Sequence, residues 1–197
     1  GEAITTYEQD VTYTVNAQTI TLHGNIQDFR SIRGTSGNGI VSIDVTENPL
    51  LARFEINLCD IEGIDFSNNP ELKEVYIRSC KKITSVNVQN LTELAYLSFE
   101  SSDLIASVDV TKNSKLEYLN LDYCRVKNLD ISRNKELEIF FYRGAQHTDL
   151  AACRQIIADL PARVPADNAR ATFDNRVSFT QADKDAMAAK NWQLLQP

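Results

Sequence analysis

A nine-residue pattern that recurs along most of the chain constrains its fold more than any other feature. The clearest copy is LEYLNLDYC, from Leu116 to Cys124, which follows the spelling LxxLxLxxC. Successive copies come 21 or 22 residues apart, and self-similarity at a fixed period of this length indicates a stacked array of structural units. Five such units begin at Ile43, Ile64, Val86, Val108 and Leu129.

The four fixed letters of the pattern mark side chains that turn inward from a short strand and from the turn before it. Burying one large side chain contributes roughly 1.5 to 3 kcal/mol, which does not offset the entropy that a single unit loses on ordering. Stacked units bury one another, so the pattern predicts parallel strands that fold as one array. The predicted inward residues are Leu51, Phe54, Ile56, Cys59; Leu72, Val75, Ile77, Cys80; Leu94, Leu97, Phe99, Ser102; Leu116, Leu119, Leu121, Cys124; and Leu137, Phe140, Tyr142, Ala145.

A second half-motif is spelled IDVTEN, IDFSNN, VDVTKN and LDISRN in four places. Together the two motifs resemble the nested class of leucine-rich repeat found in secreted bacterial cell-surface proteins, over residues 43–149. The resemblance implies an α/β solenoid with parallel strands on one side and short extended or turn segments on the other. In the third unit Asn90 comes one position early and is followed by Leu91, so we expect a shifted back turn there.

We expect a single repeat domain with caps at both ends. Residues 1–42 are expected to form a β-type N-terminal cap and a degenerate first repeat, with alternating apolar residues before position 16 as strands. Because Ala17, Ile20, Leu22 and Asn25 fit LxxLxLxxN, we expect the main sheet to start there. The Gly-, Ser- and Asn-rich segment that follows predicts a surface loop, with an insertion at residues 30–39.

Residues 150–197 are expected to form the C-terminal helical and strand cap. Residues 149–160 place apolar side chains at helical spacing between an N-capping Asp149 and the stop at Pro161, and residues 180–191 predict a second capped helix. Residues 169–175 and 192–195 predict short strands. The KNW spelling near the end resembles the cap of secreted bacterial members of this repeat class, which implies that Trp192 seals the core.

The formal net charge of -7 and a pI of about 4.9 argue against binding to nucleic acid or to an anionic membrane surface. No run of about twenty apolar residues and no signal-peptide pattern occurs, so we expect no membrane insertion by this segment. We interpret Gly1 before Glu2 as a trimmed start. The resemblance implies a location outside the cytoplasm, exported or anchored at the cell surface, and we expect a monomer.

Reactive groups are few. His23 and His147 lie far apart in the array, and no catalytic or phosphate-binding motif occurs, so we expect neither an enzyme nor a cofactor. Cys59, Cys80 and Cys124 share one repeat position with Ser102, which predicts buried structural thiols rather than disulfides or a metal site. A column of Asp44, Asp65, Asn87, Asp109 and Asp130 invites a calcium site, but such residues favour their own local turns, and we expect no metal.

Function is expected at the outward positions of the strands, which alternate with the inward ones. Exposed tyrosines there either pack across strands or form a binding face, because aromatic residues beside arginines and carboxylates have the composition of interface hot spots. We predict recognition of a protein partner by this main-strand face, with glycan binding by the same aromatic residues, or a role as a structural spacer, as alternatives. The predicted contact residues are Glu55, Tyr76, Arg78, Tyr96, Glu100, Tyr118, Asn120, Asp122, Phe141 and Arg143.

Overall fold

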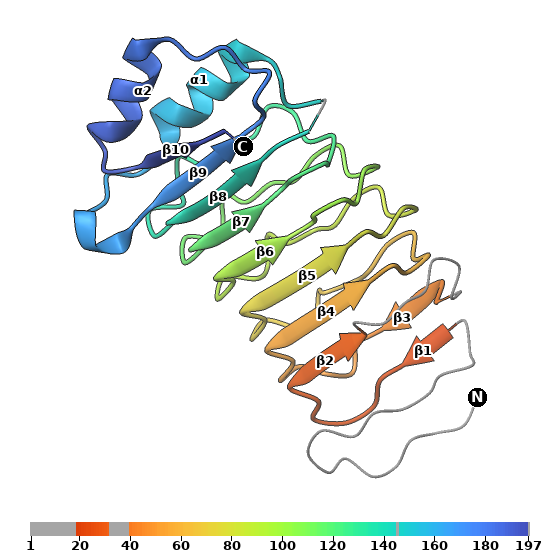
Figure 1. The fold of residues 1–197 in the computed structure, drawn as a ribbon. Coiled ribbons are helices and arrows are strands. Elements are labelled where there is room, and N and C mark those ends of the chain that lie inside the picture. The colour runs from red at the N-terminus through yellow and green to blue at the C-terminus, as the bar shows by residue number, and fades with distance from the viewer. Residues whose placement is uncertain (1–18, 32–39, 145, 197) are drawn as a thin grey trace.

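Strands from successive repeats lie side by side in one parallel sheet of eight, in the order β10-β9-β8-β7-β6-β5-β4-β2 (Figure 1). The structure is a computed structural model and describes residues 19–31, 40–144 and 146–196. The strands of this main sheet are β2 (Asp28–Ser31), β4 (Arg53–Asn57), β5 (Glu74–Arg78), β6 (Tyr96–Ser98), β7 (Tyr118–Asn120), β8 (Ile139–Tyr142), β9 (Arg170–Phe173) and β10 (Gln193–Leu195).

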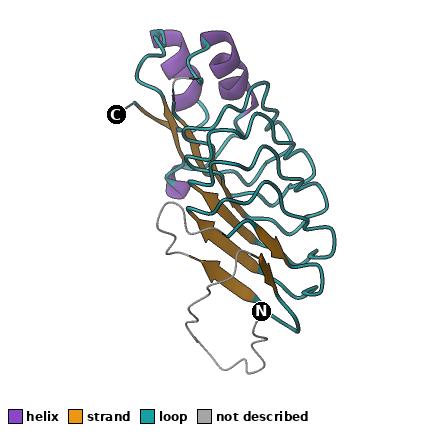
Figure 2. Ribbon diagram, turned by 90° about the vertical axis from the view of Figure 1, so that its right-hand side faces the viewer, coloured by secondary structure: helices purple, strands orange, loops and turns teal. Residues whose placement is uncertain are grey.

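The register of the sheet confirms the predicted repeat. Phe54, Val75, Leu97, Leu119 and Phe140 are direct partners on neighbouring strands, and all five are fully buried. The second half-motifs run along the opposite side as turns and extended segments, so the cross-section has strands on one side and loops on the other (Figure 2). The fold is therefore a leucine-rich-repeat solenoid.

The main sheet begins later than predicted. Ile20, in β1 (Thr19–Thr21), pairs with Ile43 in β3 (Ser42–Asp44), and these two strands form a separate small sheet on the loop side. The first main strand is β2, where Phe29 pairs with Phe54. Both half-motifs share the spelling LxxLxLxxN, so that spelling alone assigned residues 17–25 to the wrong side. Residues 30 and 31 belong to β2 rather than to an insertion, whereas residues 1–18 and 32–39 lie outside the described residues.

Buried asparagines join the turns on the loop side. The Asn69 side-chain amide donates to Val45 O at 2.9 Å and to Asn48 O at 2.8 Å, and Asn113 and Asn134 repeat this pair of bonds two and three units further on. These side chains are fully buried. Because an unpaired carbonyl in the core costs roughly 1 to 3 kcal/mol, each asparagine stabilises the unit before its own.

The third unit keeps this turn although it lacks the asparagine, so the predicted shift of its back turn is wrong. Leu91 occupies the buried position, and its N–H donates to Val88 O at 3.0 Å, as Asn69 N–H donates to Phe66 O. The neighbouring Asn90 reaches across with its side-chain amide and donates to Phe66 O at 2.8 Å. One of the two carbonyl bonds is thereby restored from a different residue.

The cysteines are buried, as predicted, and all four are free. Cys124 Sγ lies 3.0 Å from Phe99 O, and the hydroxyl of Ser102 donates to Ile77 O at 3.0 Å, so both side chains contact the strand of the preceding unit. Burial raises the pKa of Cys124 to about 12. The Cys124 thiol therefore remains protonated and acts as a small core side chain.

The C-terminal segment covers the last repeat with α1 (Leu150–Asp159), η1 (Pro165–Asp167), β9, α2 (Gln181–Ala188) and β10, which confirms the predicted helices and strands. Trp192 is buried, as predicted, and its indole N–H donates to Pro161 O at 2.7 Å. The ammonium group of Lys190 donates to the carbonyls of Ile157, Ala158 and Leu160 at 2.6 to 3.0 Å. This cation satisfies the free carbonyls at the end of α1 and suits the negative end of its dipole.

His147 lies buried at the junction between the last repeat and α1. Its ring stacks on Tyr142 with the centroids 3.8 Å apart, and Nδ1–H donates to Arg143 O at 3.1 Å. Burial lowers the pKa of His147 below its ordinary value. The folded protein therefore holds this imidazole neutral where the unfolded chain binds a proton.

Replacing Asn113 with leucine should destabilise the array by about 2 kcal/mol, because Val88 O and Leu91 O lose their donors. Adding Lys112→Asn should restore part of this loss, since position 112 corresponds to Asn90 in the third unit. Urea unfolding measures both effects, with Lys112→Ala at an exposed turn position as the control. Equal stabilities of Asn113→Leu and the wild type would contradict this account.

Stability should fall as the pH drops below about 6.5, the ordinary pKa of histidine, because the unfolded state then binds a proton that the folded His147 does not. The slope from this one group is at most about 1.4 kcal/mol per pH unit. His147→Gln should flatten the free energy of unfolding between about pH 5 and 7, because the variant has no group at this position that takes up a proton on unfolding. Parallel curves for His147→Gln and the wild type would refute this assignment.

Candidate functional site on the main-strand face

The outward side chains of β4 to β8 form three columns across the sheet, which we call the main-strand face. The register confirms that Tyr96 and Tyr118 share the first column and that Tyr76 and Phe141 lie in the second. The first column holds Arg53, Glu74, Tyr96, Tyr118 and Ile139, the second Glu55, Tyr76, Ser98, Asn120 and Phe141, and the third Asn57, Arg78, Glu100, Asp122 and Arg143.

At the β4 and β5 end of the face, two guanidinium groups lie over the ring of Tyr76. Their central carbons are 4.8 Å (Arg53) and 4.5 Å (Arg78) from the ring centroid. Both arginines donate to the buried carboxylate of Glu55, at 2.6 and 3.2 Å, and Arg53 also pairs with Glu74. Burial, reinforced by the charge of Glu74, raises the pKa of Tyr76 to about 12. This end is thus charge-balanced and held in place by its own contacts.

Three rings form a row across β6, β7 and β8. The ring centroids of Tyr96 and Tyr118 are 6.1 Å apart, and those of Tyr118 and Phe141 are 5.7 Å apart. The Tyr96 hydroxyl donates to Glu117 at 3.0 Å, which raises the pKa of Tyr96, and Asn120 donates to the Tyr118 hydroxyl oxygen at 3.2 Å. We call these three rings the aromatic row. Each ring is fixed by a neighbour, so the row offers preformed contact area.

A buried carboxylate closes the third column. Asp122 is 0% exposed, and the backbone N–H of Arg143 donates to its Oδ1 at 2.6 Å while the guanidinium of Arg143 donates to Oδ2. A comparable arrangement occurs two strands later, after β9, where Gly144 N–H and Arg176 donate to Asp174. These bonds, chiefly those from the Arg176 side chain, hold the pKa of Asp174 well below its usual range.

The close packing beside Tyr123 explains why position 144 is a glycine. Its φ is +129°, and a Cβ at this position would lie 3.1 Å from the Cα of Tyr123. Only glycine adopts this backbone conformation beside Tyr123 without strain. Tyr123 itself is half exposed and lies beside the Arg143 guanidinium, so it extends the face by one aromatic side chain.

The predicted contact residues fall into two groups. Glu55, Asn120 and Asp122 are buried, so their predicted direct contact with a ligand requires correction: their oxygen and amide atoms hold Arg53, Tyr118 and Arg143. The other predicted contact residues are at least partly exposed, and their contact with a ligand remains a prediction. They are Tyr76, Arg78, Tyr96, Glu100, Tyr118, Phe141 and Arg143.

Sequence reasoning did not single out Arg53, Glu117 or Tyr123 as site residues. The alternation along the strand already placed Arg53 outward. Its contact, however, is with the ring of Tyr76 on the next strand, β5, which alternation within β4 does not predict. Glu117 and Tyr123 lie beyond the ends of β7, where the period of two no longer applies. Their places depend on the turns, for which the strand pattern carries no signal.

The aspartate column lies on the loop side, and its carboxylates close local turns as expected. Asp44 accepts from Thr46 N–H at 3.0 Å, and Asp109 accepts from Thr111 N–H at 2.9 Å. These bonds lower the pKa of both carboxyls, chiefly through the backbone N–H for Asp44 and through the hydroxyl for Asp109. Within residues 19–31, 40–144 and 146–196, no three His, Cys, Asp or Glu side chains are arranged to hold a metal ion.

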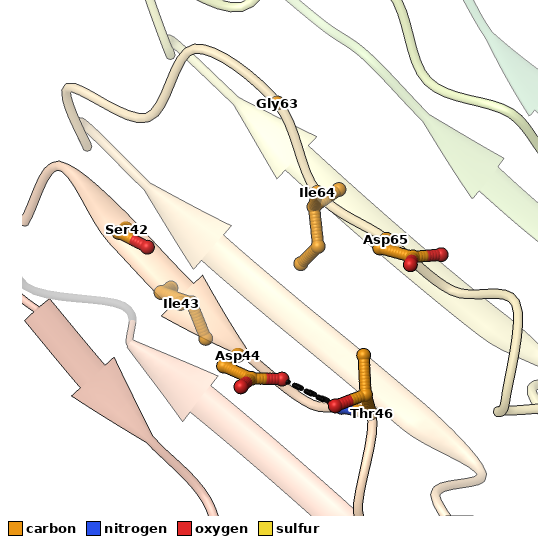
Figure 3. A pocket seen from close by; sticks show the side chains of 7 residues that line it. All are labelled: Ser42, Ile43, Asp44, Thr46, Gly63, Ile64 and Asp65. Atoms are coloured by element: carbon orange, nitrogen blue, oxygen red, sulfur yellow. Dashed lines mark hydrogen bonds between the residues drawn. The ribbon is translucent and has the colours of Figure 1, made fainter.

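A shallow pocket of about 500 Å³ lies at the N-terminal end of this column (Figure 3). Asp44 and Asp65 both line it, together with Ile43, Ile64 and Gly63. Asp44 accepts a hydrogen bond from Thr46 N–H, and Asp65 accepts one from Ser67 N–H. Each carboxylate therefore already has a hydrogen-bond partner within its own turn. The main-strand face, with its aromatic and arginine side chains, is therefore the stronger candidate site.

The chain thus has a leucine-rich-repeat fold, with aromatic and arginine side chains on its main-strand face. Among the described residues, no helix is both long enough and apolar enough to cross a membrane. No protein-family model matches the sequence, and no curated protein sequence is similar to it.

Among solved structures, the chain is similar to one described as the functional domain of InlJ from Listeria monocytogenes, which includes a cysteine ladder. The two are 18% identical with a TM-score of 0.47, over 79% of this chain and 41% of that chain. The chain thus spans less than half the length of that structure.

Asp122→Ala should destabilise the protein by about 3 kcal/mol, because it leaves the half-buried guanidinium of Arg143 and its backbone N–H without their acceptor. Asp103→Ala should cost less than about 1 kcal/mol, since Asp103 forms an exposed ion pair with Lys81. Chemical denaturation compares the two variants. Similar losses at the two positions would show that Asp122 is not a buried anchor for the face.

Proposed function

We propose that the chain is a non-enzymatic binding module that recognises a protein partner through the main-strand face. The observation that carries this proposal is the aromatic row beside arginines that are already fixed by carboxylates. Rigid aromatic and arginine side chains dominate protein interfaces, because little conformational entropy is lost when they are covered. Parallel strands at a spacing of about 4.8 Å hold them in one rigid surface.

The ring contacts favour a protein over a glycan. A sugar stacks on the open face of an aromatic ring, but Tyr118 has ring neighbours on two sides, and two guanidinium groups lie over Tyr76. Three residues of the face whose side-chain oxygens would accept from sugar hydroxyls, namely Glu55, Asn120 and Asp122, are buried. The accessible parts are ring edges, hydroxyl groups and guanidinium edges, which suit a polypeptide surface.

We extend the proposal to the repeat class and the location. The paired half-motifs resemble the nested repeats of secreted bacterial cell-surface proteins, which supports an exported or surface-anchored protein that acts as a monomer. Four buried free thiols fit this location, because burial protects them from oxidants.

Tyr96→Ala combined with Tyr118→Ala should weaken binding of a purified protein partner at least about 100-fold, because it removes two adjacent hot-spot side chains. Val41→Ala removes an exposed apolar side chain directly before β3 on the loop side and should leave binding unchanged. Partners are isolated with the wild-type chain, and calorimetry then measures their affinity for all three chains, whose folding is checked by thermal unfolding.

Equal affinity for the wild type and the tyrosine variant would refute the main-strand face as the binding surface. A glycan array run in parallel distinguishes the alternative. Binding of a sugar that is lost in the tyrosine variant would replace the protein partner by a glycan.

A further inference from the structure

The arginines of β2 to β8 all form ion pairs, whereas two carboxylates beside the aromatic row form none among the described residues. Within the ranges that the structure describes, neither Glu100 nor Glu117 forms an ion pair, although Glu117 accepts the hydrogen bond from Tyr96. The arginines are paired as Arg30 with Asp28, Arg53 with Glu55 and Glu74, Arg78 with Glu55, and Arg143 with Asp122.

The two carboxylates lie on opposite sides of the aromatic row, one at the start of the strands and one beyond their ends. Glu117 directly precedes β7, and Glu100 follows β6 in the third column, where its carbonyl accepts from Ser79 N–H. Glu117 is level with the start of the strands, whereas Glu100 lies about five residue positions further along, so roughly 16 Å separates them in the strand direction. An extended peptide of about five residues spans this distance.

Carboxylates surround the Tyr96 end of the aromatic row. Glu117, Glu74 and Glu138 all act on the hydroxyl of Tyr96, where the hydrogen bond to Glu117 has the largest effect on its pKa. Two cations of the main sheet that form no ion pair within the described part of the chain, Lys73 and Arg170, lie directly before β5 and on β9, whereas the aromatic row lies on β6 to β8. Together with a net charge of -7, this leaves the row with an acidic border.

We infer that the partner presents an extended segment with a basic side chain toward each end and an apolar or aromatic side chain between them, which rests on the proposed function. The central side chain covers Tyr118 and Phe141, and the basic side chains pair with Glu117 and Glu100. An acidic segment meets like charge at both ends, and like-charge contacts across an interface select against a partner. The guanidiniums of the face offset this repulsion only in part: each already pairs with a carboxylate of its own, although the charges of Arg143 and Glu100 still act on one another.

Synthetic peptides with a central tyrosine and with arginine, glutamine or glutamate two positions to either side test the inference on the whole chain. The arginine peptide should bind most tightly, and raised salt should weaken it. Glu100→Lys with Glu117→Lys should weaken the arginine peptide about tenfold or more and make the glutamate peptide the tighter ligand. Glu62→Lys with Glu71→Lys changes the net charge equally at exposed positions off the face and should preserve the original order.

Glutamate peptides that bind the wild type as well as arginine peptides, or no measurable binding of the arginine peptide, would overturn the inference. So would an equal effect of the two charge-reversal variants. The proposed function is tested by a different result, namely whether the Tyr96→Ala, Tyr118→Ala variant loses the protein partner. That result does not depend on how the peptides bind. A partner that needs Tyr96 and Tyr118 but ignores the reversal leaves the proposed function standing and rejects the basic segment.

Discussion

Every turn of this solenoid carries backbone carbonyl groups into the core, and the stack depends on the side-chain amides that bind them. Asn69, Asn113 and Asn134 each donate to two carbonyls of the unit before their own, so a unit is satisfied only when its neighbour is in place. Cooperation between units therefore comes from directional bonds as well as from apolar burial. The third unit shows that the carbonyl sets the requirement, since Asn90 reaches Phe66 O from the adjacent position when Leu91 fills the core.

The same stacking determines what the main-strand face can do. The register places the side chains of one column a strand spacing apart. Charged and aromatic side chains of neighbouring strands are therefore close enough to interact. Arg143 folds onto Asp122, Arg53 and Arg78 onto Glu55, and Tyr118 lies between two rings. Most of the polar groups of the face thus stabilise the face itself, and they present a surface whose shape exists before a partner arrives.

Much of the fold could be predicted because its signal is repeated. The period places Phe54, Val75 and Leu97 in register without knowledge of any contact, and the capping residues Asp149 and Thr180 mark the two helices. The strand at β2 was missed because the two half-motifs share one spelling, and the short first copy fits either side. Burial of Asp122 could not be predicted, since alternation gives the direction of a side chain but not what folds over it. That depends on Arg143, one strand away.

Charged groups of the main-strand face differ in whether they already form an ion pair, and this difference determines what each can offer a partner. An arginine that already binds a carboxylate offers a partner its ring contacts and shape but little net charge, whereas a carboxylate without a cation still attracts one. On this face the first kind is represented by Arg53, Arg78 and Arg143, and the second by Glu100 and Glu117. Affinity is therefore assigned to the aromatic row and selectivity to its acidic border, so the two properties can change independently within the same stack of strands.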